Sequence, residues 1–154
     1  MKKLCLLTIL FSLTAIAQDG KPNFSGVWEL QVANSDFGPL PAPESQTSVV
    51  DHQEPQLKLN TTARTVQGEL TAAYVYTTDG QENTNEVRGS TRKSRTRWES
   101  KELVTEAEFE AQGLKIRLKD RWRLSEDGQT WTSDRTLNSD MGEAVQKLIF
   151  AKKK

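Results

Sequence analysis

The sequence predicts an all-β protein: an antiparallel up-and-down meander of about eight to ten strands, closed into a barrel, with little helix. Three observations predict this fold. Apolar and polar residues alternate with a period of two along nearly the whole chain after residue 24, and helical periodicity is almost absent. Turn signals interrupt the alternation about every 8 to 12 residues. Opposite charges also face each other across three of the predicted strands.

The turn signals are short segments that contain Gly or Pro. They are Asp36-Phe37-Gly38-Pro39, Glu54-Pro55, Gln67-Gly68, Asp79-Gly80, Arg88-Gly89, Gln112-Gly113, Asp127-Gly128 and Met141-Gly142. Strands joined by turns this short pair with their neighbours in the chain, which gives a meander. A two-residue turn at Asp79-Gly80 places Tyr76 opposite Asn83 and Tyr74 opposite Asn85.

Charge pairing fixes the register of three strands. Turns at Ser100-Lys101 and Gln112-Gly113 place the glutamates of the middle strand opposite basic residues, and Glu106 and Glu108 have one on both sides, as Glu108 opposite Lys93 and Arg117. Each such pair contributes roughly 0.2–1 kcal/mol. The basic segments that resemble nucleic-acid-binding patches are thereby neutralised, so we expect no nucleic-acid partner.

The opposite face is predicted to point into the barrel. Its residues are Leu70, Ala72, Tyr74, Tyr76, Asn83, Asn85, Thr96, Trp98, Leu103, Thr105, Ala107, Phe109, Leu114, Ile116, Leu118, Asp120, Trp122, Trp131, Ser133, Arg135, Leu137, Leu148 and Phe150. Asp120 and Arg135 can pair across adjacent strands, which offsets the cost of burying them. The interior is then either filled, with one internal ion pair, or a lumen lined by aromatics with polar anchors.

One long connection, about Asn34 to Glu44, carries proline at every second position from Pro39 to Pro43. Such a segment is extended and makes few backbone hydrogen bonds, so it is predicted to cross one mouth of the barrel. Two interpretations are open. It is a passive crossover held at the rim by Phe37 and Leu40, or a lid over a cavity.

The N-terminal segment predicts export. Lys2 and Lys3 precede an apolar run, and Ala15-Ile16-Ala17 supplies the small residues of a cleavage site. We expect a signal peptide over residues 1–17, a short leader over 18–23 and a single β-barrel domain over 24–152. The run is too short to span a bilayer, so we expect no stable membrane insertion, and a bacterial periplasmic or secreted location.

Composition excludes several kinds of chemistry. The only cysteine, Cys5, lies in the signal peptide, so the exported chain has no disulfide and no thiolate metal site. Without Lys2 and Lys3, 19 basic residues face 21 acidic ones, which gives no electrostatic preference for nucleic acid or anionic membranes. His52 is the only histidine and is expected to be a surface residue at the end of a strand, and no nucleophile elbow or phosphate loop is present. We expect no metal and no cofactor.

Phe24-Ser25-Gly26-Val27-Trp28 opens the first predicted strand and resembles the first conserved region of lipocalins and their calycin relatives. The resemblance implies a lipocalin-like barrel in which Gly26 allows entry to the strand and Trp28 plugs the closed end. It also implies a late basic residue stacked on Trp28, for which Arg135 or, less closely, Lys147 is the match. The chain also resembles small exported bacterial proteins of unassigned function that begin Asn-Phe-Ser-Gly-x-Trp.

Two functional classes follow. The first is an exported, monomeric, lipocalin-like protein that binds a small apolar or amphipathic molecule in the barrel lumen. Its candidate ligand-binding residues are Tyr74, Tyr76, Asn85, Trp98, Phe109, Asp120, Trp122 and Arg135. The alternative is a filled barrel that acts through its exterior, as an envelope structural component or a protein inhibitor. An enzyme is the third choice, because no catalytic constellation is visible.

Overall fold

The structure, a computed structural model, describes residues 20–154 and confirms the predicted fold class. Its ten strands are β1 (Gly26–Leu30), β2 (Ser45–Gln53), β3 (Gln56–Thr65), β4 (Gly68–Thr77), β5 (Asp79–Val87), β6 (Ser90–Glu99), β7 (Glu102–Ala111), β8 (Leu114–Leu124), β9 (Thr130–Ser139) and β10 (Gly142–Lys152). The only helical element among these residues is a 3-10 turn, η1 (Val32–Asn34), so none of their helices could cross a membrane. The expected signal peptide lies outside the described residues.

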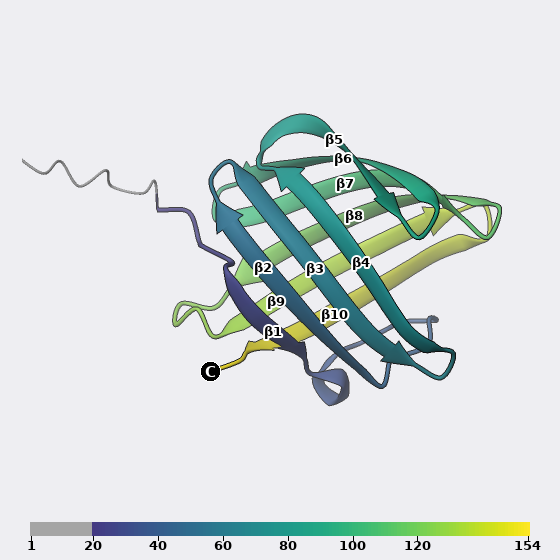
Figure 1. Ribbon diagram of the computed structural model, residues 1–154, viewed down its shortest axis with the longest axis horizontal. Helices are drawn as coiled ribbons and strands as arrows, with labels where there is room; N and C mark the ends of the chain where they lie inside the picture. The colour runs from purple at the N-terminus through teal and green to yellow at the C-terminus, as the bar shows by residue number, and fades with distance from the viewer. Residues whose placement is uncertain (1–19) are drawn as a thin grey trace, which may run out of the picture.

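All ten strands form one antiparallel sheet that curls into a nearly closed barrel (Figure 1). Consecutive strands pair with each other, with one exception, and β1 also pairs with the last strand, β10. The exception is β4 and β5, which stand at the two ends of the hydrogen-bonded order. Two predicted turns, Arg88-Gly89 and Gln112-Gly113, have positive φ at both residues, as tight hairpins of twisted strands require.

The predicted charge ladder on β6, β7 and β8 is confirmed in register. Glu108 pairs in register with Lys93 and Arg117, and a Glu108 carboxylate oxygen lies 3.7 Å from Arg117 Nε. Side chains also choose diagonal partners, because their length lets them reach along the strand. Arg97 stands opposite Val104 of β7, for example, yet its Nη1 lies 3.1 Å from a carboxylate oxygen of Glu106, two positions along that strand.

The outer ion pairs also cover one apolar residue. Val104 faces outward on β7, in register between Arg97 and Arg121, yet it is fully buried. Arg121 bridges Glu99 at 2.8 Å and Glu102 at 2.5 Å, which holds its side chain against the sheet. This network raises the pKa of the Arg121 guanidinium, chiefly through the hydrogen bond to Glu102. The exterior is thus a self-neutralised shell, as the sequence predicted.

Side-chain amides close the seam, the gap between β4 and β5. Asn85 Oδ1 accepts a hydrogen bond from the Val75 backbone N–H at 2.8 Å, and Asn85 Nδ2 donates to the Val75 carbonyl at 3.1 Å. Asn83 Oδ1 accepts from the Thr77 backbone N–H at 2.7 Å. Two asparagines of β5 thus satisfy β4 backbone groups that a neighbouring strand would otherwise bind.

The predicted two-residue hairpin at Asp79-Gly80 is wrong in its position. The chain turns at Thr78, and Asp79 already pairs with Arg97 of β6. A register shift between Asp79 and Glu82 carries β5 away from β4. The two strands therefore diverge directly after the turn, too far apart for a backbone ladder, and only asparagine side chains bridge the gap.

Asn85→Ala should lower the free energy of unfolding by about 1–2 kcal/mol, because it leaves the edge of β4 without its partner. Amide exchange should accelerate most at β4 and β5, where the seam opens. Asn60→Ala, a change of an exposed asparagine on β3, is the matched control and should cost less than about 0.5 kcal/mol. Equal effects of the two variants in urea unfolding would contradict a bridging role for Asn85.

The connection between β1 and β2 lies against β10. Asp36 forms an isolated antiparallel bridge with Lys147, and Gln146 Nε2 donates to the Phe37 carbonyl at 3.2 Å. Phe37 packs against the core, as expected, but Leu40 is 42% exposed and does not hold the segment. The structure therefore fits a crossover anchored on β10, not a lid.

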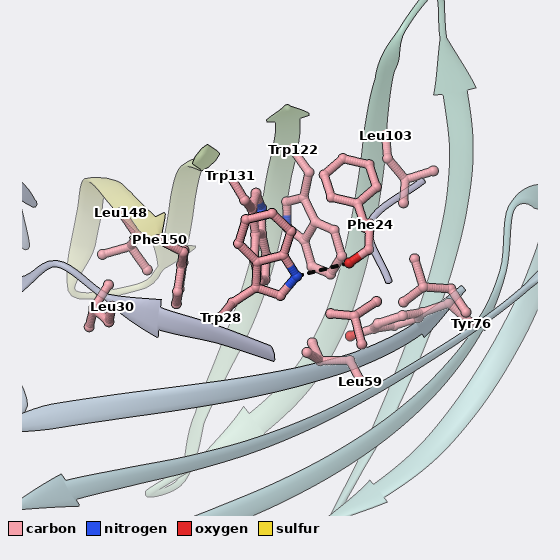
Figure 2. Packing of buried hydrophobic residues seen from close by; sticks show 12 residues of the cluster. Phe24, Trp28, Leu30, Leu59, Tyr76, Leu103, Trp122, Trp131, Leu148 and Phe150 are labelled. Carbon is pink, nitrogen blue, oxygen red and sulfur yellow. Dashed lines mark hydrogen bonds between the residues drawn. The ribbon is translucent and has the colours of Figure 1, made fainter. Parts of the chain in front are cut away.

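An aromatic cluster fills the closed end of the barrel (Figure 2). Trp131 lies at the centre, with its ring centroid 4.3 Å from that of Phe150, 4.5 Å from Trp122 and 6.0 Å from Trp28. Phe24 lies just before β1 and is fully buried beside them. These rings show that the predicted inward face of β8, β9 and β10 is correct.

Trp28 is fully buried, and its Nε1 donates a hydrogen bond to the Phe24 carbonyl at 2.8 Å, drawn as the dashed line in Figure 2. The basic residue over its ring is Lys152, whose Nζ lies 5.3 Å from the ring centroid. Gly26 has φ of 143°, and a Cβ there would meet Lys152 Cε at 2.6 Å. Glycine therefore leaves room for the lysine stem beside the tryptophan.

This arrangement corrects the residue that the resemblance implied. Arg135 does not stack on Trp28, because it pairs with Asp120 inside the barrel. Lys147 is exposed on the outer face of β10, where its backbone pairs with Asp36. Only Lys152, at the end of β10, stands in register with Trp28 on β1.

Candidate functional site

A cavity of about 680 Å³ occupies the barrel on the open side of the aromatic cluster. Inward residues of β2 to β9 line it, and Trp122 belongs to both the cavity and the cluster. Turn residues Arg88, Gly89 and Gln112 also line it, so it opens at the β5–β6 and β7–β8 turns. Sites for small molecules typically measure about 300–1,000 Å³. The interior is therefore hollow, not filled.

Six of the eight residues predicted from the sequence to bind a ligand line this cavity. They are Tyr74, Tyr76, Phe109, Asp120, Trp122 and Arg135. Asn85 and Trp98 are not part of its lining. Asn85 bridges the seam, and Trp98 lies at the closed end, with its ring stacked on Phe24 at 6.3 Å. Alternation along a strand predicts that a side chain points inward, but not at which depth it meets open space.

The polar centre of the cavity is the predicted pair of Asp120 and Arg135. Arg135 Nη2 and Nε donate to Asp120 Oδ2 at 2.8 and 3.1 Å, and Ser133 Oγ donates to Asp120 Oδ1 at 2.5 Å. Burial alone would lower the pKa of Arg135, but the Asp120 carboxylate outweighs it and raises that pKa. The Arg135 guanidinium therefore stays charged, and its charge is paired with the Asp120 carboxylate.

Arg92 is the cavity residue that the sequence interpretation missed. Its guanidinium carbon lies 3.8 Å from the ring centroid of Phe109 and 5.2 Å from that of Tyr74, and Nη1 donates to the Tyr74 hydroxyl at 3.4 Å. Among residues 20–154, no carboxylate lies within 4.0 Å of its charged nitrogens. The sequence did contain a signal: Arg92 lies an even number of positions from the inward residues Thr96 and Trp98, so its side chain points to the same face of the strand.

The two tyrosines form the wall beside Arg92. The rings of Tyr74 and Tyr76 stack with centroids 5.7 Å apart. Burial raises the pKa of the Tyr76 hydroxyl, so it stays protonated and neutral. The interior of the cavity therefore combines aromatic walls, one self-neutralised ion pair and, at Arg92, one arginine without a carboxylate partner.

The sequence matches no protein-family model, and no curated protein matches it. Solved structures are similar in shape. Secretory abundant heat soluble protein 4 from Ramazzottius varieornatus gives a TM-score of 0.55 at 14% identity, with 88% of this chain and 97% of that one covered. Zebrafish ileal bile acid-binding protein complexed with cholic acid gives 0.56 at 14%, with 84% and 98% covered. Rv2717c from M. tuberculosis gives 0.54 at 13%, with 85% and 93% covered.

The fold is that of a calycin-like barrel. At these identities the likeness shows the fold alone. It agrees with the resemblance of Phe24-Ser25-Gly26-Val27-Trp28 to the opening of calycin sequences. In this calycin-like barrel, no group of three or more His, Cys, Asp or Glu among residues 20–154 is placed to hold a metal ion.

A polar cluster seals the closed end of the calycin-like barrel on the outer side of the aromatic rings. Glu54 Oε1 accepts from His52 Nε2 at 2.9 Å and from Trp98 Nε1 at 2.8 Å, and Glu54 Oε2 accepts from Thr78 Oγ1 at 2.6 Å. His52 Nδ1 accepts from the Phe24 backbone N–H at 3.3 Å, so Nε2 carries the imidazole proton. His52 is thus buried and satisfied; the sequence placed it at the surface as a strand-end residue.

The same cluster makes the stability of the fold depend on pH. Burial alone would raise the pKa of Glu54, but hydrogen bonds from Thr78, His52 and Trp98 together hold that pKa below its ordinary value of 4.5. A depressed folded-state pKa gives stability that is present above the unfolded-state value. This contribution is therefore lost as the pH falls below about 4.5.

Glu54→Gln should cost about 1 kcal/mol near neutral pH, because it weakens three hydrogen bonds to a charged, partly exposed acceptor. At about pH 3 wild type and variant should differ less, since the stability that comes from the depressed pKa of Glu54 is lost as the pH falls below about 4.5. Urea unfolding at both pH values measures this. Glu126→Gln, a change in the exposed β8–β9 turn, is the control and should have no effect at either pH. A difference that stays constant with pH would contradict the assignment.

Proposed function

We propose that this protein is an exported binding protein that holds a small apolar or amphipathic molecule in the barrel lumen. The observation that carries the proposal is the 680 Å³ cavity, which has aromatic walls and opens beside the Arg88-Gly89 turn. Zebrafish ileal bile acid-binding protein, which has a similar fold, is complexed with cholic acid. The described residues that line the cavity include no histidine, which favours binding over catalysis.

A role through the exterior has weaker support. A hollow of about 480 Å³ on the outside runs over β6, β7 and β8 and carries the charge ladder. Most of its charged side chains already pair with one another: Glu82 with Arg95, Glu106 with Lys119 and Glu108 with Arg117. A partner would have to replace these pairs at little gain. The open lumen therefore favours the first functional class.

Binding is tested with Nile red, a neutral dye whose emission reports an apolar environment. The mature protein should bind about one dye per chain. Ala72→Trp places a large ring inside the cavity and should weaken the dye at least about tenfold, since the ring occupies space the dye needs. Ala73→Trp makes the same change on the exposed face of β4 and should leave binding unchanged.

Two results would contradict the proposal. Equal losses from Ala72→Trp and Ala73→Trp would show that the dye binds the surface or an unfolded fraction. No binding of Nile red to a correctly folded protein, judged by its circular dichroism, would favour the exterior role.

Export is proposed from the N-terminal segment alone. Expression of the full chain in a Gram-negative bacterium should place the protein in the periplasm. Its mass should correspond to cleavage after Ala17, with Gln18 as the new N-terminus. A full-length chain that stays in the cytoplasm would contradict export without affecting the proposed ligand binding.

A further inference from the structure

Three arginines line the cavity: Arg88 is exposed at the rim, and the two inside, Arg92 and Arg135, are in different electrostatic states. Arg135 is bound by Asp120 through two hydrogen bonds, of 2.8 and 3.1 Å. Arg92 has no carboxylate within 4.0 Å among the described residues, and its Nε is buried without a hydrogen-bond partner. Its charge rests only on the rings of Tyr74 and Phe109 and on one long hydrogen bond to a hydroxyl.

Arg92 is partly buried, and a charge withdrawn from water without a counterion is costly; cation–π contacts offset only part of that cost. An anion that entered the cavity would complete the pairing of Arg92 through charge-assisted hydrogen bonds. The same anion at Arg135 would share one cation with Asp120 and would be repelled by it. Arg92 is therefore the better partner for an acidic group.

The position of Arg92 fixes how such a ligand would lie. Lys93 pairs in register with Glu108, so Arg92 stands opposite Phe109, close to the β7–β8 turn where the cavity opens. Trp122 stands opposite Leu103, six positions deeper on β7, which is ~20 Å along the strand. At the rim, Arg88 and Glu110 have opposite charges and give no net attraction to either sign.

We propose that the ligand is an anionic amphiphile, whose acidic group binds Arg92 near the mouth while its apolar tail points inward to Trp122. This inference rests on the proposed lumen binding and specifies the ligand class and its orientation. Arg92 is then the residue that selects acids over neutral molecules, and the Asp120–Arg135 pair keeps the deeper part of the cavity electrically neutral.

The charge preference is tested with three probes of equal chain length: dodecanoate, dodecanol and dodecyltrimethylammonium, each displacing Nile red below its micelle concentration. Dodecanoate should bind at least about tenfold more tightly than dodecanol, and the cationic probe should bind worst. Arg92→Met keeps an apolar stem on Phe109 and should abolish the preference for the acid while dodecanol still binds. Arg92→Lys should retain part of the preference.

Arg88→Gln is the matched control, because it also removes one positive charge at the mouth. It should change the affinity for dodecanoate less than about twofold, since an exposed charge is screened by salt. An equal loss from Arg88→Gln and Arg92→Met would overturn the assignment of the site. Equal affinities of wild type for the acid and the alcohol would overturn it as well, even if Arg92→Met proved too unstable to study.

The orientation is tested with brominated dodecanoates, because bromine quenches nearby tryptophan emission. Trp28, Trp98, Trp122 and Trp131 all lie toward the closed end. Bromine on the last carbon should therefore quench strongly, and bromine next to the carboxylate should quench weakly. The reverse order would overturn the proposed orientation.

The proposed function can survive the failure of this inference. If Nile red binds, and dodecanol displaces it as well as dodecanoate does, the proposed lumen binding stands and only the acid selectivity fails. If none of the neutral or charged probes binds, both proposals fail together.

Discussion

Trp28→Ala should destabilise the protein by about 3–5 kcal/mol, because the deleted indole is fully buried in the aromatic cluster. The variant loses the ring contact with Trp131, the hydrogen bond to the Phe24 carbonyl and the contact with Lys152. Small domains are stable by only about 5–15 kcal/mol, and this one has no disulfide among its described residues. Chemical unfolding followed by circular dichroism measures the loss.

Two further variants define the cause. Trp28→Phe keeps an aromatic ring but removes the Nε1 donor, so it should cost less than the alanine variant. Val27→Ala, a change of the half-buried neighbour on β1, should cost about 1 kcal/mol. If Trp28→Ala unfolded at the same denaturant concentration as wild type, the closed end would not depend on this plug.

Arg135→Met should cost about 3 kcal/mol, because it leaves the Asp120 carboxylate buried with Ser133 as its only hydrogen-bond donor. The Arg135 side chain is 30% exposed and that of Asp120 only 5%, so water can replace little of the hydrogen bonding that the carboxylate loses. The free energy of unfolding in urea, near neutral pH, measures the effect.

The double variant Asp120→Leu with Arg135→Met separates the ion pair from its burial. Replacing both charges by apolar side chains removes the unpaired carboxylate, so the double variant should be more stable than Arg135→Met alone. If the single variant Arg135→Met and the double variant lost the same free energy of unfolding, the arginine would contribute through packing, and its pairing with Asp120 would contribute little to stability.

Charge and polarity patterns predicted the register of β6, β7 and β8 from the sequence. Glu106 and Glu108 of β7 each have a basic residue opposite them on both sides, and a slip of one position would place Glu108 against Ile116 or Leu118 of β8. The same alternation predicted that Asp120 and Arg135 meet across β8 and β9. Cross-strand pairing is local once the turns are known, so sequence was sufficient for it.

Features that depend on how the barrel closes were not predicted. Lys152 lies over Trp28 because β1 and β10 are neighbours, a contact between the two ends of the chain that no local pattern encodes. The sequence also did not show that Trp98 lies at the closed end of the barrel and that Arg92 lines the cavity, because both depend on where the curved sheet leaves its interior empty. Alternation specifies a direction for each side chain but no volume, so the hollow interior came only from the structure.

The pairing of β1 with β10 determines when the barrel can be completed. Trp28 belongs to the first strand, and its cover, Lys152, is the third residue from the C-terminus. Contacts between residues so distant in sequence form late in folding, because a long loop must close first. A growing chain therefore cannot cover its tryptophan plug with Lys152 until β10 has been synthesised.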